Sequence, residues 1–204
     1  MGLVLRQARY DLLAFWRNPA SAFFTFVFPI MFLVIFNLVF GSETVQVPGG
    51  EVDTSTFYVP AIVAFSVISA CYTNIAISVS FARDGGVLKR LRGTPLPPIA
   101  FILGRILQAM AVAVIVVIIV LVLGIVFYDV DPPGEKLPAF LLTLLVGAAT
   151  FCALGLAITT IIPNADASPA VVNASILPLL FISNVFIPTE TAPDWQKDNA
   201  SLIP

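Results

Sequence analysis

The most distinctive polar segment of this sequence runs from residue 83 to residue 98. Three apolar residues recur there at helical spacing: Val87, Leu88 and Leu91. Basic residues flank this stripe: Lys89, Arg90 and Arg92. The pattern predicts a short helix that ends near Gly93, with Asp84 as a candidate cap of its N-terminal end. Such a helix suits docking into a groove of a partner protein, and it equally suits a basic loop that sets topology and binds anionic lipid.

Catalytic chemistry has few candidates in this chain. The sequence contains no His, which removes the commonest general base and the commonest metal ligand. Its two cysteines, Cys71 and Cys152, fall inside apolar runs, where a thiol usually serves as a small core residue. The apolar runs contain no carboxylate, which a proton-driven carrier normally uses as a relay. An intramembrane enzyme is therefore the least favoured class of function.

Long charge-free runs must position these residues. Of the 204 residues, 59% are hydrophobic and 11% charged, and the mean hydropathy is +1.01. A soluble domain is about 25% charged, so an ordinary soluble fold is excluded. A helix of roughly 20 apolar residues crosses a bilayer core about 30 Å thick. Five runs lack Asp, Glu, Lys and Arg and are long enough to do so: 18–42, 54–82, 106–128, 137–165 and 167–189.

The basic residues predict the orientation. Eight of the ten Lys and Arg residues precede the first run or lie between the second and the third, and only Lys136 and Lys197 fall on the other side. By the positive-inside rule the N-terminus is cytoplasmic. The loops near 43–56, 129–136 and 188–204 are then external. The short loop after the fourth run carries Asp166 and no basic residue, so its cytoplasmic placement rests on the number of spans alone.

These observations predict an all-α polytopic membrane protein with one domain, 1–204. It begins with an amphipathic segment, 1–18, whose apolar face we expect in lipid at the cytoplasmic interface; a simple basic flank is the alternative. One arc of that segment carries Val4, Leu5, Ala8, Leu12, Phe15 and Trp16. The spans are 19–42, 57–82, 101–128, 137–163 and 168–188, with a cytoplasmic loop at 83–98 and an outer segment at 189–204. An odd number of spans leaves Pro204 outside, so we expect a longer protein with a sixth span.

Polar side chains within the spans are expected to form hydrogen bonds between helices. As a set, some of them are candidates to line a pathway for an amphipathic substrate: Asn37, Ser69, Thr73, Asn74, Gln108, Asn173 and Asn184.

The run from Asp84 to Leu96 resembles the signature loop of type-2 ATP-binding-cassette exporter permeases. That loop has an acidic residue, Gly, Val or Thr, then Leu-Lys-Arg-Leu-Arg, a small residue, and Thr or Ser before Pro. Further segments are similar to the same family: the elbow helix ending at Arg17-Asn18-Pro19, Gly104-Arg105, Leu177-Pro178 to Ile187-Pro188, and Pro193-Asp194-Trp195. The chain departs from the family in showing five spans rather than six, and in having Ser183-Asn184 where Ser-Gly is common.

The resemblance implies a membrane subunit of an ATP-driven exporter of drugs, lipids or polysaccharides in a prokaryotic plasma (inner) membrane. Its partners would be a nucleotide-binding ATPase subunit, a second copy or a homologous permease, and membrane lipids, with no nucleic acid. The chain has no Gly-rich phosphate loop, so the resemblance implies no catalytic residue, metal or cofactor here, with ATP and Mg on the partner. The implied ATPase-docking residues are Asp84, Gly86, Val87, Leu88, Lys89, Arg90, Leu91 and Arg92. An ion-coupled secondary transporter or channel, or a non-transporting anchoring subunit, is the alternative.

Overall fold

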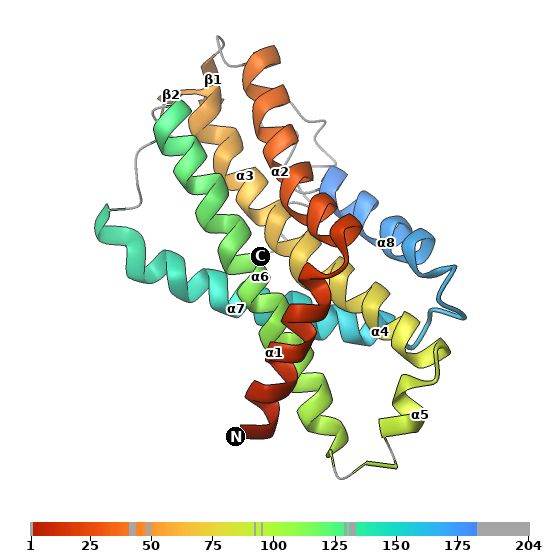
Figure 1. Ribbon diagram of the computed structural model, residues 1–204. Helices are drawn as coiled ribbons and strands as arrows, with labels where there is room; N and C mark the ends of the chain where they lie inside the picture. Colours follow the sequence, from red (N-terminus) through yellow and green to blue (C-terminus); the bar gives the residue numbers. More distant parts are fainter. Residues whose placement is uncertain are drawn as a thin grey trace.

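The computed structural model describes residues 2–40, 44–47, 50–91, 93–94, 96–128, 130 and 134–182. The longer helices are α1 (Gly2–Trp16), α2 (Pro19–Phe40), α3 (Thr54–Ile68), α6 (Pro98–Tyr128), α7 (Leu137–Ile158) and α8 (Ser168–Ile182). Shorter elements are the π-helical turn η1 (Ser69–Thr73), α4 (Asn74–Asp84), α5 (Val87–Leu91) and the 3-10 turn η2 (Gly134–Lys136). The predicted all-α membrane fold is confirmed (Figure 1). A short antiparallel hairpin, β1 (Thr44–Val47) with β2 (Gly50–Asp53), was not predicted.

Four stretches of helix in the described part of the chain are long and apolar enough to cross a membrane: Pro19–Val39, Tyr58–Asp84, Pro98–Tyr128 and Leu137–Ile158. The second joins α3, η1 and α4 without a break. The fourth of these stretches, α7, stops at Ile158, five residues before the predicted end of its span at 163, because hydrogen-bonded turns begin at Thr159. The described part of the predicted fifth span, 168–188, is α8, and positions 183–188 lie outside the described residues, as does the outer segment 189–204.

The N-terminal helix packs lengthwise on α6 rather than only on lipid. With 31 residues, α6 is about 46 Å long, more than the roughly 30 Å apolar core of a bilayer. Figure 1 shows α1 alongside the first part of α6. A Cβ on Gly104 would lie 2.6 Å from Cγ of Gln7, so the glycine allows this close approach. The predicted lipid-facing arc is therefore corrected for Phe15, which is buried in the core, and for Leu12, which packs against it.

The break between α1 and α2 falls where Asn18-Pro19 predicts it. Helix α1 ends at Trp16, and the side-chain oxygen of Asn18 accepts a hydrogen bond from the amide of Ser21 at 3.3 Å, which caps α2. The Trp16 and Phe26 rings stack across the break, with centroids 5.3 Å apart. The proline thus separates two helices that still pack on each other.

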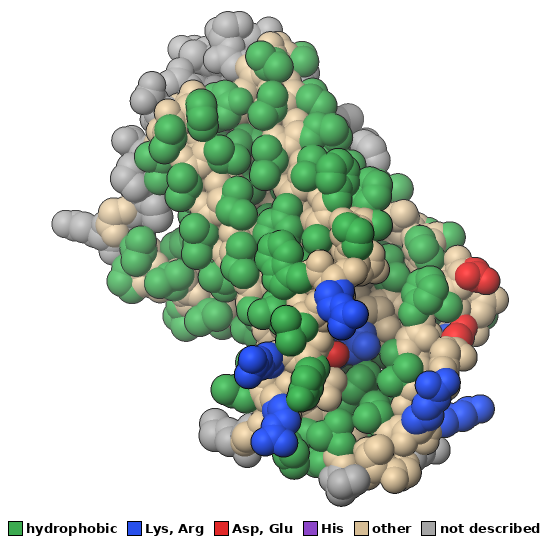
Figure 2. All heavy atoms as spheres, viewed as in Figure 1, with side chains coloured by type: hydrophobic (Ala, Val, Ile, Leu, Met, Phe, Trp, Pro, Cys, Tyr) green, Lys and Arg blue, Asp and Glu red, His purple; other side chains and the backbone are tan. Residues whose placement is uncertain are grey.

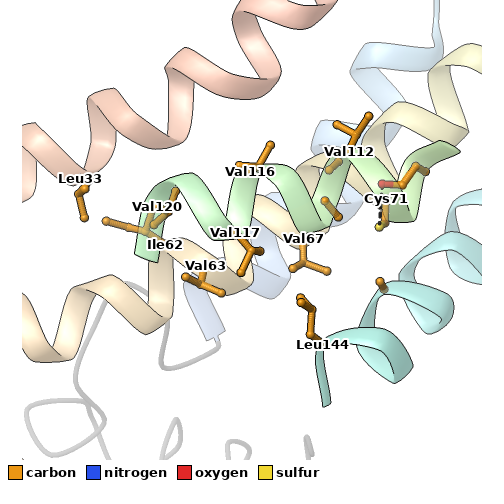
Figure 3. Close-up of a cluster of buried hydrophobic side chains, with 14 of the residues drawn as sticks. Leu33, Ile62, Val63, Val67, Cys71, Val112, Val116, Val117, Val120 and Leu144 are labelled. Carbon is orange, nitrogen blue, oxygen red and sulfur yellow. Dashed lines mark hydrogen bonds between the residues drawn. The ribbon is translucent and has the colours of Figure 1, made fainter. Parts of the chain in front are cut away.

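The core lies between α3, η1 and α6 and is built from small and β-branched side chains (Figure 3). Residues of α6 recur in it every three or four positions: Ala109, Val112, Ala113, Val116, Val117 and Val120. Helix α3 and η1 contribute Ile62, Val63, Val67 and Cys71. Within a bilayer, such residues hold helices together by close packing rather than by leaving water. Leu33 of α2 and Leu144 of α7 extend the cluster to the neighbouring helices.

Most described polar side chains of the spans bond to their own helix, not across helices as predicted. Asn37 donates to the carbonyl of Leu33 at 2.9 Å and Ser66 to that of Ile62 at 2.7 Å. The same backward bond, four residues along, is made by Ser80, Thr143 and Thr150. Because a hydroxyl satisfied in this way needs no partner, these residues carry no information about neighbouring helices.

The contact of α7 with η1 provides a stability test. A Cβ on Gly155 would lie 2.8 Å from the carbonyl oxygen of Tyr72, a backbone atom that cannot turn aside, whereas one on Gly147 of the same helix meets nothing within 4 Å. We expect Gly155→Ala to destabilise the protein by about 1–3 kcal/mol through overpacking. Gly147→Ala should be neutral or stabilising by up to about 1 kcal/mol, since Ala favours helix. Thermal unfolding midpoints in detergent check both, and equal midpoints for the two variants would contradict the packing described.

Candidate coupling site

Most of the charged side chains that the structure describes gather at one end of the molecule. Figure 2 shows hydrophobic side chains over α2, α3 and the upper part of α6, with the basic side chains below them around α1 and α5. We call this end, which holds α5, the first turns of α1 and the turn between α7 and α8, the basic end. The hairpin β1–β2 lies at the opposite end (Figure 1). The distribution separates an apolar zone that suits lipid from a polar end that suits water and lipid headgroups.

A pair of glycines joins the second span to α5. Gly85 follows the last residue of α4 with φ −70° and ψ 3°, and its amide donates to the carbonyl of Phe81 at 2.9 Å. Gly86 has φ 71°, a left-handed conformation that side chains disfavour. This turn ends α4 and lets the chain change direction, and α5 begins at the next residue.

Helix α5 projects from the molecule with no buried residue. Val87 is 38% exposed, Lys89 and Arg90 are exposed, and Leu88 and Leu91 are half-buried. The hydroxyl of Thr94 donates to the carbonyl of Leu91 at 2.8 Å, which closes the C-terminal end. The position of Arg92 lies outside the described residues. The predicted short helix is thus present, with an apolar stripe that the rest of the described chain leaves partly uncovered.

The two residues before the glycine pair bind a distant turn. Arg83 donates through Nη1 to the carbonyl of Thr159 at 2.9 Å and through Nη2 to that of Ile162 at 2.7 Å. The Asp84 carboxylate accepts hydrogen bonds from Arg83 Nε and from the backbone amide of Ala165. The prediction that Asp84 caps α5 is therefore wrong, because its described partners lie in α4 and in the turn between α7 and α8. These bonds place that turn on the same side as α5, as the number of spans predicted.

A second polar group lies where α1 meets α6. Gln7 Nε2 donates to Asp11 at 3.1 Å, and the guanidinium of Arg105 lies 5.0 Å from the centroid of the Phe101 ring. Burial raises the pKa of Asp11, against the opposing effects of the Gln7 hydrogen bond and the charge of Arg105. The contact between α1 and α6 therefore carries a carboxylate whose charged form is disfavoured.

The candidate pathway residues do not share one environment. Asn37, Ser69, Thr73 and Asn74 are half-buried, Asn173 is exposed on α8, and Asn184 lies outside the described residues. Gln108 is only 7% exposed, one turn beyond Gly104 on α6, and its Nε2 has no hydrogen-bond partner among the described residues. Ser69 and Thr73 bound the π-helical turn η1, a departure from α-helix that often marks functional positions. Their role as a pathway stays a prediction.

The sequence analysis did not identify two side chains that join separate segments of the chain. Arg83 was counted only as a positive charge, because the carbonyls that it binds leave no sequence signal. Tyr72 was not singled out, although its hydroxyl lies 2.6 Å from the Ser175 hydroxyl and so joins η1 to α8. A tyrosine inside an apolar run does give a signal, since a buried phenol needs a hydrogen-bond partner.

The fold and this end define a polytopic helical membrane protein with a short basic helix beyond its second span. The family model for the ABC-2 type transporter matches residues 4–204. The chain therefore belongs to the ABC-2 type transporter family, whose members named below are permeases.

Three relatives show the range of similarity. The putative transport permease ycf38 of Cyanophora paradoxa is 26% identical over 192 residues, which cover 92% of this chain and 65% of that protein. The probable multidrug ABC transporter permease YbhR of Escherichia coli K12 is 26% identical over 154 residues, 76% of this chain and 42% of its own length. The daunorubicin resistance ABC transporter permease protein DrrB1 of Streptomyces coeruleorubidus is 23% identical over 188 residues, 91% of this chain and 65% of its own. The chain thus spans less than two thirds of each of these relatives, and no solved structure matches it.

The environment of Asp11 predicts a pH dependence. Because burial raises the pKa of this carboxyl in the folded state, stability falls as pH rises from the ordinary aspartate pKa of about 3.9 through the raised value. We expect Asp11→Asn to raise the unfolding midpoint slightly at pH 7, with the difference from wild type disappearing near pH 4. Thermal unfolding in detergent at several pH values measures this, and a lower midpoint for the variant at pH 7 would show that the charge of Arg105 outweighs burial.

Proposed function

We propose that this chain is the membrane subunit of an ATP-driven exporter and that α5 is its coupling helix. The observation that carries the proposal is an exposed helix with the apolar residues Val87, Leu88 and Leu91, joined to the second span by two glycines, in a chain of the ABC-2 type transporter family. A partner ATPase subunit would receive this stripe in a groove, as amphipathic helices are received elsewhere. The chain itself would contribute no site for ATP or Mg, which the partner would bind.

The charges of α5 suit the same role. Lys89 and Arg90 are exposed beside the stripe, and Arg90 Nη2 donates only a long 3.5 Å bond to the carbonyl of Gly85. Free guanidinium and ammonium groups at the rim of an interface steer association and fix its register more than they add affinity. We infer an ATPase groove with an apolar floor and an acidic rim.

The remaining parts of the proposal follow the family and the named relatives. The substrate would be an amphipathic drug, lipid or polysaccharide moved outward across a prokaryotic plasma (inner) membrane, with the N-terminus in the cytoplasm. Two relatives are named for multidrug transport and daunorubicin resistance, which favours the first of these substrate classes. A second copy of the chain or a homologous permease would complete the pathway, to which exposed Asn173 would contribute.

A charge placed in the stripe tests the docking role. We expect Leu88→Asp or Leu91→Asp to abolish binding of the ATPase subunit, since burying an unpaired carboxylate at an interface costs several kcal/mol, or more than a hundredfold in affinity. Membrane insertion and the unfolding midpoint should stay unchanged, because neither side chain belongs to the core. Co-purification of the ATPase from membranes measures binding, with daunorubicin efflux as the activity probe.

Lys136→Asp is the matched control, because this exposed residue lies at the start of α7 and away from the basic end. It should bind the ATPase like the wild type. Loss of insertion in the Leu88 and Leu91 variants would mean that α5 is structural, and undiminished binding of the ATPase would overturn the docking role.

A further inference from the structure

The turn between α7 and α8 is held by the residues that precede α5. Arg83 donates to two of its carbonyls, and Asp84 accepts the amide of Ala165. The side chains of Arg83 and Asp84 are 35% and 34% exposed, so these bonds are only partly open to solvent. Their partners lie 76 to 81 positions further along the chain. The end of α4, just before α5, is thus fixed to the turn that joins α7 to α8.

The bonds satisfy groups that a helix end leaves unpaired. The last carbonyls of a helix have no partner within it and carry partial negative charge. Arg83 reaches the carbonyl of Thr159, the residue that caps α7, and the carbonyl of Ile162 in the following turn. A charged guanidinium with two donors in a fixed fork suits this double contact. Arg83 therefore caps α7 from another span.

The turn is firm enough to transmit movement. The Asn164 side chain accepts the amide of Ala167 at 2.8 Å, and the buried hydroxyl of Ser168 donates to the carbonyl of Ala165 at 2.6 Å. Ile162 is 2% exposed and packs in a cluster with Tyr72 of η1 and Val172 of α8. These contacts fix the turn to the start of α8, so a force on the turn reaches that helix.

We propose that Arg83 and Asp84 form a clasp that makes the end of α4, from which α5 departs, move as one body with the inner ends of α7 and α8. This inference rests on the proposed function, because it concerns what happens when an ATPase displaces α5. Without the clasp, α5 would act on the second span alone, through the Gly85-Gly86 turn. With it, one docking helix moves three spans, and the two residues are positioning residues for transport.

Distances between spin labels in the full-length protein, bound to its ATPase subunit in lipid nanodiscs, test the clasp. One pair of labels, at Thr94 just after α5 and Ile118 in α6, reports the movement of α5. The other pair, at Phe81 in α4 and Ala170 in α8, reports the clasp, and all four positions are exposed in the described chain. The native Cys71 and Cys152 are completely buried, so the introduced cysteines take the label. Addition of Mg-ATP should change the distance from 94 to 118 but leave that from 81 to 170 unchanged.

Loss of the clasp should allow the end of α4 to move independently of α8. In Arg83→Gln we expect the distance from 81 to 170 to change with Mg-ATP, and the efflux of daunorubicin per ATP hydrolysed to fall about tenfold. Arg83→Lys, which keeps the charge but not the fork, should restore part of both effects. Lys136→Gln, which removes a charge at the start of α7, should behave as wild type. Asp84→Asn serves as the second variant if Arg83→Gln does not accumulate.

The outcomes distinguish this inference from the proposed function. If the ATPase does not bind, or if the distance from 94 to 118 does not respond to Mg-ATP, the proposed function fails. If that distance responds but the wild-type distance from 81 to 170 changes as well, or if Arg83→Gln matches the wild type, the clasp is overturned while the proposed function stands.

Discussion

The backbone of a chain that crosses a bilayer must satisfy its own hydrogen bonds, and most of this structure depends on that constraint. It accounts for the four long apolar helices and for the hydroxyls of Ser66 and Ser80, which bond back to their own helix. It also explains why the backbone that is not regular α-helix in the described chain concentrates at the ends of the spans. The turn η1 is the interior exception, and there the chain remains helical with a wider hydrogen-bonding pattern.

Because the spans are self-sufficient, the unpaired groups at their ends are available for contacts between segments. Such contacts occur at the basic end. Arg83 donates hydrogen bonds to carbonyls at and just after the end of α7, and Asp84 accepts one from the amide of Ala165. Two glycines then release α5 from the second span. The same few residues therefore end one helix, hold another, and set the position of the helix that we propose to meet the ATPase.

The fold class was predictable because charge-free runs have one stable solution in lipid. The break at Asn18-Pro19, the short helix after the second span and the family were predictable as well, since proline, glycine and the residues from Asp84 to Leu96 leave direct signals in the sequence. The packing of α1 on α6 was not predictable, because an amphipathic helix has the same sequence pattern whether its apolar side faces lipid or protein. The clasp was hidden for a related reason: Arg83 binds backbone carbonyls, which every residue has, so nothing in the turn marks it as a partner.

The most direct test of the central claim is a photo-crosslink from α5 in native membranes. A benzophenone amino acid at Val87, which is 38% exposed, should capture a soluble subunit that carries a phosphate-binding loop. The same group at Val126, 66% exposed near the far end of α6, should capture no such subunit. Capture of lipid alone from position 87, while the ATPase subunit remains bound to the permease, would contradict the claim that α5 is the coupling helix.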